Sequence, residues 1–294
     1  MVTKELIKEV TVNILRRAET TLPSDVKEAL VRAYECETRE IAKVQLKAML
    51  ENVKLADEMQ RPLCQDTGIP LFYVSFGSGN ANPHEIESGI REGVKEATET
   101  IPLRPNVVNA ITREGRAGNE ANIGDRMPYI NYKIADFNGL EIIAFPKGGG
   151  SENVSAFTML TPKPEKESVK EIKKFVLDSV LRAAGKPCPP TIIGVGIGGS
   201  ADMAMRVAKA ALLRPVSVRH KDARIARIEE ELLEAVNNTG IGPMGLGGKT
   251  TALDVHIETA DTHITSLPVA INFQCWAARK ASAKIYSSDE VEYL

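Results

Sequence analysis

Apolar residues recur at three- and four-residue spacing through much of the chain, and shorter β-rich runs separate these stretches. The first sixty residues predict three helices, and the third, from about Arg39 to Met59, carries Leu46 and Val53 on its apolar face. It must end near Pro62, because the residue before a proline avoids helical geometry. Further helices are predicted over residues 86–97, 168–184 and 225–236, with another that ends at residue 213.

Strands are predicted where β-branched and aromatic residues gather. These runs cover residues 69–76, 191–195, 253–257 and 269–273. Two more strands between residues 128 and 145 flank Asn138-Gly139, a dipeptide typical of tight hairpins. Residues 161–167 are predicted to be a surface connection. The interleaving predicts an α/β fold, with a helical N-terminal section over 1–60 and a mixed α/β body over 61–294, which we take as one domain.

Composition narrows the possible classes of protein. The 294 residues carry 37 basic and 39 acidic side chains, so the chain lacks the basic footprint of a general nucleic-acid binder. No apolar stretch approaches the roughly 20 residues that a membrane helix needs. Residues 1–17 lack the apolar core of a signal peptide, which predicts a soluble, cytoplasmic protein whose four cysteines are reduced.

The four cysteines have different settings. Cys36 is in phase with alanines of the second predicted helix, so we expect a small buried hydrophobe. Cys64, Cys188 and Cys275 lie at the ends of predicted elements, where ligands and catalytic groups tend to occur. Their spacing contains no CxxC clip, which leaves three interpretations open: unrelated structural cysteines, a zinc site and an iron–sulfur site.

The two metal interpretations have different requirements. Zinc with three thiolates needs a fourth ligand, and His256 and His263 are the nearest candidates in sequence to Cys275. Three thiolates on a [4Fe–4S] cluster instead leave one iron without a protein ligand. Such an open iron is a Lewis acid able to bind a hydroxyl and a carboxylate of a substrate.

Glycine-rich segments suggest ligand contacts. Residues 194–199 fit the pattern GxGxxG, but the acidic residue that a dinucleotide site needs about 20 positions later is missing. An anion at a helix N-terminus and close strand–helix packing both remain possible there. Residues 245–250 imitate a phosphate loop, except that Pro243 occupies the position of its first glycine. The segment KGGGSEN at 147–153 follows a strand and suits a close approach of the backbone to a ligand.

Several charged residues are candidates for chemistry. Asp66 and His263 form a carboxylate–imidazole pair able to relay a proton if they meet, although each is also an ordinary loop residue. Arg104, held between prolines, suits a bidentate grip on a carboxylate, or a surface ion pair. His220 and the basic segment 214–227 are interpreted as a solvated helix face.

Six motifs together resemble the class I, iron–sulfur fumarases. They match the α subunit of the two-subunit form and the N-terminal half of single-chain members, and the α subunit of L-tartrate dehydratase is similar in its cysteine loops. KGGGSEN resembles the fumarase version more closely. The motifs are CQDTG (64–68), LRPN (103–106), KGGGSEN (147–153), PCPP (187–190), GVGIGG (194–199) and the HITS…QCW run (263–276).

This resemblance implies a set of roles. It implies reversible hydration of fumarate to (S)-malate, with an open cluster iron as Lewis acid. The implied cluster ligands are Cys64, Cys188 and Cys275. The implied substrate contacts are Gln65, Arg104 and the backbone at Gly149, and the implied proton-transfer pair is Asp66 with His263.

The resemblance also implies a partner. Single-chain relatives continue beyond the position of Leu294 into a domain that carries the base, so the expected partner is a separate β subunit, in an α2β2 assembly. No nucleic-acid or membrane partner is expected. The alternatives are an L-tartrate dehydratase α subunit and, from other classes, a zinc-stabilised structural subunit or a nucleotide-binding module.

Overall fold

A computed structural model describes residues 2–77, 82–115 and 122–294. The chain divides into two compact units. Unit 1 comprises residues 1–23, 52–149 and 279–294, and unit 2 comprises residues 24–51 and 150–278. The helix α3 (Glu40–Met59) runs through one of the boundaries, and the short helix α5 (Gly149–Glu152) lies at another. No helix in the described ranges is both long and apolar enough to cross a membrane.

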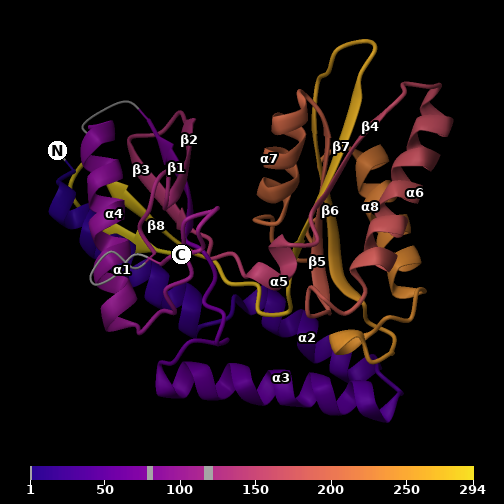
Figure 1. The fold of residues 1–294 in the computed structure, drawn as a ribbon, viewed down its shortest axis with the longest axis horizontal. Coiled ribbons are helices and arrows are strands. Elements are labelled where there is room, and N and C mark those ends of the chain that lie inside the picture. The colour runs from indigo at the N-terminus through magenta and orange to yellow at the C-terminus, as the bar shows by residue number, and fades with distance from the viewer. Residues whose placement is uncertain (1, 78–81, 116–121) are drawn as a thin grey trace. The chain divides into compact units, whose positions relative to one another are not determined.

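Unit 1 is built on a five-stranded sheet with the order β2-β1-β3-β8-β9. The helices α1 (Lys4–Thr20) and α4 (Pro83–Thr100) pack together beside it (Figure 1). Their apolar stripes are buried in one cluster with the inward side chains of the strands, among them Phe72 and Ile142. The strands are β1 (Leu71–Phe76), β2 (Tyr129–Ile134), β3 (Gly139–Ala144), β8 (Ala281–Tyr286) and β9 (Val291–Tyr293).

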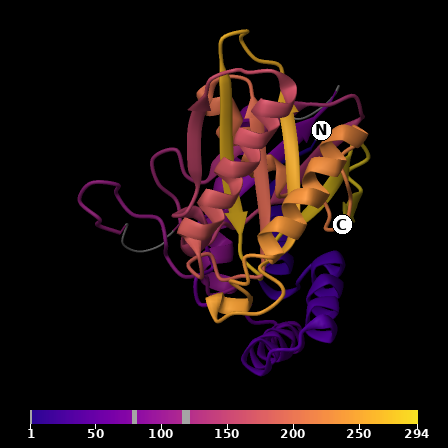
Figure 2. The same ribbon diagram turned by 90° about the vertical axis from the view of Figure 1, so that its right-hand side faces the viewer.

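Unit 2 is a three-layer arrangement around a four-stranded sheet with the order β4-β7-β5-β6. The helix α7 (Ala201–Ala211) covers one face, and α6 (Glu165–Ala183) and α8 (Ala223–Asn237) lie side by side on the other (Figures 1 and 2). The remaining elements of this unit are α2 (Ser24–Cys36) and the short 3-10 helix η1 (Pro243–Gly245). The strands are β4 (Ala156–Leu160), β5 (Thr191–Gly198), β6 (Ala252–Ala260) and β7 (Leu267–Gln274).

The α/β class is confirmed, whereas the hairpin predicted around Asn138-Gly139 is wrong. β2 pairs in parallel with β1, and β3 pairs antiparallel with the other edge of β1. The connection between β2 and β3 therefore passes over the end of β1, where the Ala135 amide donates to the Phe76 carbonyl. Asn138 ends the connection and Gly139 begins β3, so the dipeptide does not close a two-residue turn. The short strands β4, β8 and β9 were not predicted.

The prediction that Cys36 is buried is also wrong. Cys36 is the last residue of α2 and is exposed, although Ala29 and Ala33 on the same helix are buried. The chain turns at this point, and the next residue, Glu37, takes the buried position. The Glu37 carboxylate accepts hydrogen bonds from the amides of Thr38, Arg39 and Lys249, which stabilise the turn.

The GxGxxG segment is mostly strand. Gly194 and Gly196 lie inside β5, where it passes against α7. A Cβ at Gly194 would lie 2.1 Å from the Ala208 carbonyl oxygen, and one at Gly196 would lie 2.1 Å from the Ala204 carbonyl oxygen. Close strand–helix packing, one of the two possibilities left open by the pattern, therefore accounts for these glycines.

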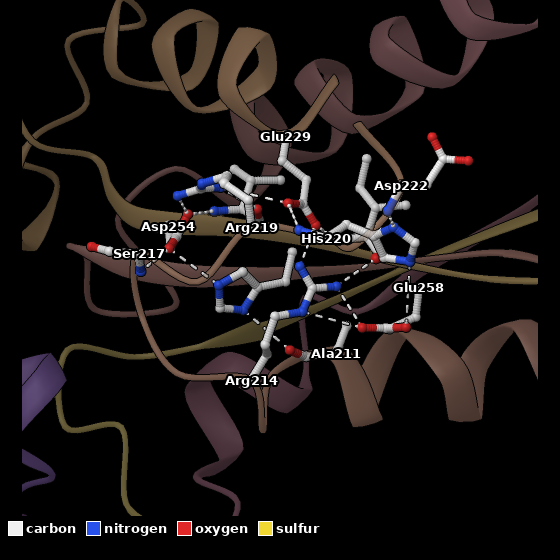
Figure 3. Close-up of polar contacts among 12 residues, drawn as sticks. Ala211, Arg214, Ser217, Arg219, His220, Asp222, Glu229, Asp254 and Glu258 are labelled. Carbon is white, nitrogen blue, oxygen red and sulfur yellow. Dashed lines mark hydrogen bonds and ion pairs between the residues drawn. The ribbon is translucent and has the colours of Figure 1, made fainter. Parts of the chain in front are cut away.

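The interpretation of residues 214–227 as a solvated helix face is wrong for its first half. Figure 3 shows Arg214, Arg219 and His220 gathered around Glu229 of α8 and around acidic residues of β6. The fully buried Glu229 accepts hydrogen bonds from the Arg214 guanidinium at 2.6 Å and from the His220 amide at 2.9 Å. Arg219 pairs with Asp254, which is also fully buried. The basic residues neutralise buried carboxylates, and hydropathy does not reveal this pairing.

Glu229 is expected to be a large contributor to the stability of unit 2. Glu229→Ala removes the hydrogen-bond acceptor of the Arg214 guanidinium and of the His220 and Ile257 amides. It also removes an ion-pair partner of Arg219 at 3.7 Å. Breaking one side of a buried ion pair costs about 3–5 kcal/mol of unfolding free energy. Glu231→Ala, on the exposed side of the same helix, is the matched control and should cost no more than about 1 kcal/mol. Equal losses in chemical denaturation would contradict this assignment.

Candidate functional site

The segment after α3 forms the exposed part of a pocket in unit 1. Cys64 and Gln65 are exposed in an irregular loop, and they line a pocket of about 470 Å³ together with Arg104. The Arg104 amide donates to the Thr67 hydroxyl at 3.0 Å, which ties the arginine segment to the cysteine loop. The structure thus brings together a thiol, an amide and a guanidinium that the sequence placed in two separate motifs.

Asp66 joins three segments of unit 1 beside this pocket. Its Oδ1 accepts hydrogen bonds from the Gly68 amide at 3.0 Å and from the Asn106 side chain at 3.2 Å. Its Oδ2 accepts from the Gly149 amide at 2.8 Å. Two of the predicted site residues, Asp66 and Gly149, are therefore in direct contact. The carboxylate holds together the loops that begin at residues 64, 103 and 147.

Gly68 of CQDTG is required by a close contact with the backbone of Lys147, the first residue of KGGGSEN. Gly68 has φ +77°, and a Cβ there would lie 2.7 Å from the Lys147 carbonyl carbon. The Ile69 amide donates to the Lys147 carbonyl at 3.0 Å, so the two segments run together as a short bridge. The absence of a side chain at Gly68 allows the two segments to meet.

Cys188 and Cys275 lie together at one end of the sheet of unit 2. Cys188 precedes β5 and Cys275 follows the antiparallel β7, so the two loops emerge at the same edge. The Trp276 amide donates to the Cys188 carbonyl at 3.2 Å, which joins these loops. Neither thiol is in a disulfide. Two of the three predicted ligands are therefore neighbours, while Cys64 belongs to unit 1.

The two histidines considered as zinc ligands lie elsewhere in unit 2. His256 is fully buried in β6, where its Nδ1 lies 3.1 Å from the Ala211 carbonyl oxygen and its Nε2 lies 3.1 Å from Asp254. His263 is exposed in the turn between β6 and β7, where its Nδ1 contacts Thr265. Within either unit, the described residues contain no group of three His, Cys, Asp or Glu side chains able to hold a metal ion.

The position of His263 limits its role. The β6–β7 connection is at the opposite end of the sheet from Cys188 and Cys275, because β6 runs parallel and β7 antiparallel to β5, which lies between them (Figures 1 and 2). The eight residues of β7 separate this turn from Cys275, which at 3.2–3.4 Å per residue is about 25 Å. His263 is therefore remote from the two cysteines of its own unit 2.

Two buried charged residues of the site were missed from the sequence. Arg279 is 1% exposed, and its Nη1 donates to the Asp66 carbonyl oxygen at 2.7 Å and to Glu19 Oε2 at 3.0 Å. Glu19 lies in the last turn of α1 and is fully buried. Neither residue stands in a motif, and a charged residue at a helix end predicts exposure, so no signal in the single sequence pointed to them.

Burial raises the pKa of Glu19 from 4.5 to about 7, and the neighbouring Arg279 only partly offsets this effect. A carboxyl whose pKa is higher in the folded state stabilises the fold most at low pH, and this contribution is lost as the pH rises from 4.5 through 7. We therefore expect the unfolding free energy of wild type, relative to Glu19→Gln, to fall by about 3 kcal/mol between pH 4.5 and pH 8. Denaturant titrations of both proteins at the two pH values measure this difference, and a constant difference would contradict the burial effect.

Comparisons with known proteins agree on one family. A profile of the fumarate hydratase (fumerase) family matches residues 8–284. A protein of Methanocaldococcus jannaschii named putative L(+)-tartrate dehydratase subunit alpha is 51% identical over 284 residues, which are 95% of this chain and 97% of that protein. The L(+)-tartrate dehydratase subunit alpha of Escherichia coli K12 is 33% identical over 289 residues, 98% of this chain and 93% of that protein.

The part of the chain that matches the family profile contains the residues of the candidate site. The matched range contains the pocket loop, the Asp66 contacts and the paired loops of Cys188 and Cys275. The profile and the relatives' names describe hydro-lyases, which add water to or remove it from a substrate. The chain belongs to the class I fumarate hydratase family and is a hydro-lyase of the fumarate hydratase and L-tartrate dehydratase type.

Proposed function

We propose that this chain is the α subunit of an iron–sulfur hydratase that converts fumarate and (S)-malate into one another. The observation that carries the proposal is the pocket in which Cys64, Gln65 and Arg104 lie together. A four-carbon dicarboxylate needs cationic and amide donors for its carboxylates and a Lewis acid for its hydroxyl. The first two kinds of group line this pocket, and a thiol stands next to them.

The proposed ligands of a [4Fe–4S] cluster are Cys64, Cys188 and Cys275. Three observations support a fit: all three are outside disulfides, all three lie in loops at element ends, and the loops of Cys188 and Cys275 are hydrogen-bonded. Zinc is less well supported, because the nitrogens of His256 face Ala211 and Asp254 and His263 is remote. Bound by three thiolates, the cluster supplies an iron without a protein ligand as Lewis acid for the substrate hydroxyl.

The chain's own residues are proposed to bind and orient the substrate. Arg104 grips one carboxylate through two parallel N–H donors, and the Gln65 amide donates a further hydrogen bond. Asp66 fixes the glycine segment through the Gly149 amide, so that the backbone of residues 148–150 lies beside the substrate. Asp66 and His263 are the proposed pair that delivers a proton to the departing hydroxyl.

The place of His263 in the sheet supports a shared site. Because His263 lies about 25 Å from Cys275 of its own unit 2, a proton delivered at the cluster comes from His263 of a second copy of the chain. An assembly with two copies, such as α2β2, provides this second copy.

Mixing experiments test the shared site. Cys275→Ser and His263→Asn assemblies are each expected to be inactive alone. The two variants are then dissociated, mixed in equal amounts and reassembled. In each mixed pair, one of the two sites combines the intact Cys275 of one chain with the intact His263 of the other. Random pairing makes half of the pairs mixed, so activity should return to about a quarter of the wild-type level. Activity that does not recover, although mixed assemblies are present, would contradict the shared site.

The substrate is tested by comparing kcat/KM for (S)-malate and L-tartrate on the same anaerobic preparation. The fumarase form of KGGGSEN supports fumarate and malate. L-tartrate is a second candidate, because both relatives described above carry the name L(+)-tartrate dehydratase. A kcat/KM at least tenfold higher for L-tartrate would replace fumarate in the proposal.

A separate β subunit is the proposed partner, and the name "subunit alpha" of the relatives supports it. The β subunit is expected to carry the base that removes the proton from carbon. A cluster-loaded preparation of this chain alone should therefore lack turnover. Full activity without a partner would refute this part of the proposal. The cytoplasm, where thiols stay reduced, is the proposed compartment.

A further inference from the structure

Glu19 holds both ends of the segment that carries Cys64 and Gln65. Its backbone carbonyl accepts a hydrogen bond from the Leu63 amide at 2.8 Å. Its carboxylate binds Arg279, whose Nη1 reaches the Asp66 carbonyl oxygen. Leu63 and Asp66 are thus held by hydrogen bonds to Glu19 and Arg279. The two exposed residues between them line the pocket.

Arg279 also packs against the glycine segment on the other side. A Cβ on Gly148 would lie 3.3 Å from Arg279 Nη2 and 3.4 Å from Asp66 Oδ2. One buried guanidinium therefore lies next to both loops to which we assign substrate contacts, although it does not line the pocket itself.

Stability alone does not explain this buried pair. Replacing a buried ion pair by apolar residues of similar volume is often neutral or stabilising, because removing two charges from water is costly. A guanidinium offers several donors in a rigid plane, whereas an ammonium is a compact charge on a flexible stem. Here Nη1 alone donates both to the Glu19 carboxylate and to the Asp66 carbonyl oxygen, so the fixed directions of its two N–H groups set the relative positions of these acceptors.

We propose that Glu19 and Arg279 are positioning residues, which set the geometry of residues 63–66 and of the adjoining glycine segment for substrate binding. The pair acts through Asp66 and Leu63 and does not touch the substrate. The expected loss of activity in variants of the pair rests on the proposed function. The expected change in the mobility of residues 63–66 does not depend on any substrate or cofactor.

The first test is hydrogen exchange of the full chain with Arg279→Lys and with Glu19→Gln. Peptides that cover residues 61–70 should exchange at least tenfold faster than in wild type, while peptides from α4 keep their protection. Glu96→Gln, which breaks the exposed Lys8–Glu96 pair between α1 and α4, is the matched control and should leave residues 61–70 unchanged. Unchanged exchange of residues 61–70 in both variants, or an equal increase in α4, would overturn the proposal.

The second test is kinetic and uses the complete enzyme. A misplacement of about 1 Å costs up to about a hundredfold in rate, so Arg279→Lys should lower kcat/KM by 10- to 100-fold. Glu19→Gln, which keeps a hydrogen-bond acceptor, should retain more activity than Glu19→Ala. Normal kcat/KM in Arg279→Lys would overturn the positioning role. A wild-type enzyme without hydratase activity would refute the proposed function, and the exchange result would still decide the role of the pair.

Discussion

Cys275→Ser is expected to lower hydro-lyase activity at least about a thousandfold. The change removes a ligand of the proposed cluster, and a Lewis-acid metal supplies several kcal/mol of transition-state stabilisation. Serine keeps the size of the side chain but is a poor ligand for iron. The Trp276–Cys188 hydrogen bond uses backbone atoms only, so the fold of unit 2 should survive the change. Turnover of malate and L-tartrate, measured with the partner subunit under anaerobic conditions, gives the result.

Cys36→Ser is the matched control for this experiment. Cys36 is exposed at the end of α2 and lies outside every contact assigned to the site. The same assay should give wild-type activity for Cys36→Ser, and Cys188→Ser should behave as Cys275→Ser does. A Cys275→Ser enzyme that keeps more than a tenth of its activity would contradict a role for this thiol in the active site.

Gly196→Ala is expected to lower the stability of unit 2 strongly. The new methyl carbon would lie 2.1 Å from the Ala204 carbonyl oxygen and 2.5 Å from the Ala208 amide nitrogen. Both neighbours are backbone atoms of α7, so only a shift of the helix away from β5 can relieve the contact. Overpacking of this kind costs about 3 kcal/mol or more of unfolding free energy. Gly194→Ala should behave similarly, because its Cβ meets the Ala208 carbonyl oxygen.

Gly115→Ala provides the control for these substitutions. Gly115 is exposed, and the nearest atom to an added Cβ is 4.0 Å away, on the side chain of Val108. The expected change is within about 0.5 kcal/mol. Denaturant midpoints of the three variants measure the difference. A Gly196→Ala protein as stable as Gly115→Ala would show that β5 and α7 are not in the contact described.

Local patterns predicted most of the fold, and pairing over long distances accounts for the errors. The apolar periodicity of α3 and α4 and the β-rich run of β1 follow from neighbouring residues. The position of β2 depends on β1, about sixty residues earlier in the chain, and the Asn138-Gly139 dipeptide carries no information about it. The pairing of Arg219 with Asp254 depends in the same way on contacts between distant elements.

The same limit applies to the site. Cys64, Gln65, Asp66 and Arg104 stand in recognisable motifs, and the structure places them around one pocket of unit 1 or directly beside it. Arg279 and Glu19 carry no motif, because their role depends on burial between segments that are far apart in sequence. His263 was assigned from its motif alone, and only the antiparallel course of β7 reveals its distance from Cys275.

Iron and sulfide analysis after anaerobic purification tests the central claim most directly, namely that Cys64, Cys188 and Cys275 hold one inorganic cluster. The account predicts about four irons and four sulfides per wild-type chain, and loss of both in the Cys64, Cys188 and Cys275 alanine variants. Zinc without sulfide in the wild type, or a full complement of iron and sulfide in any of the three variants, would contradict it.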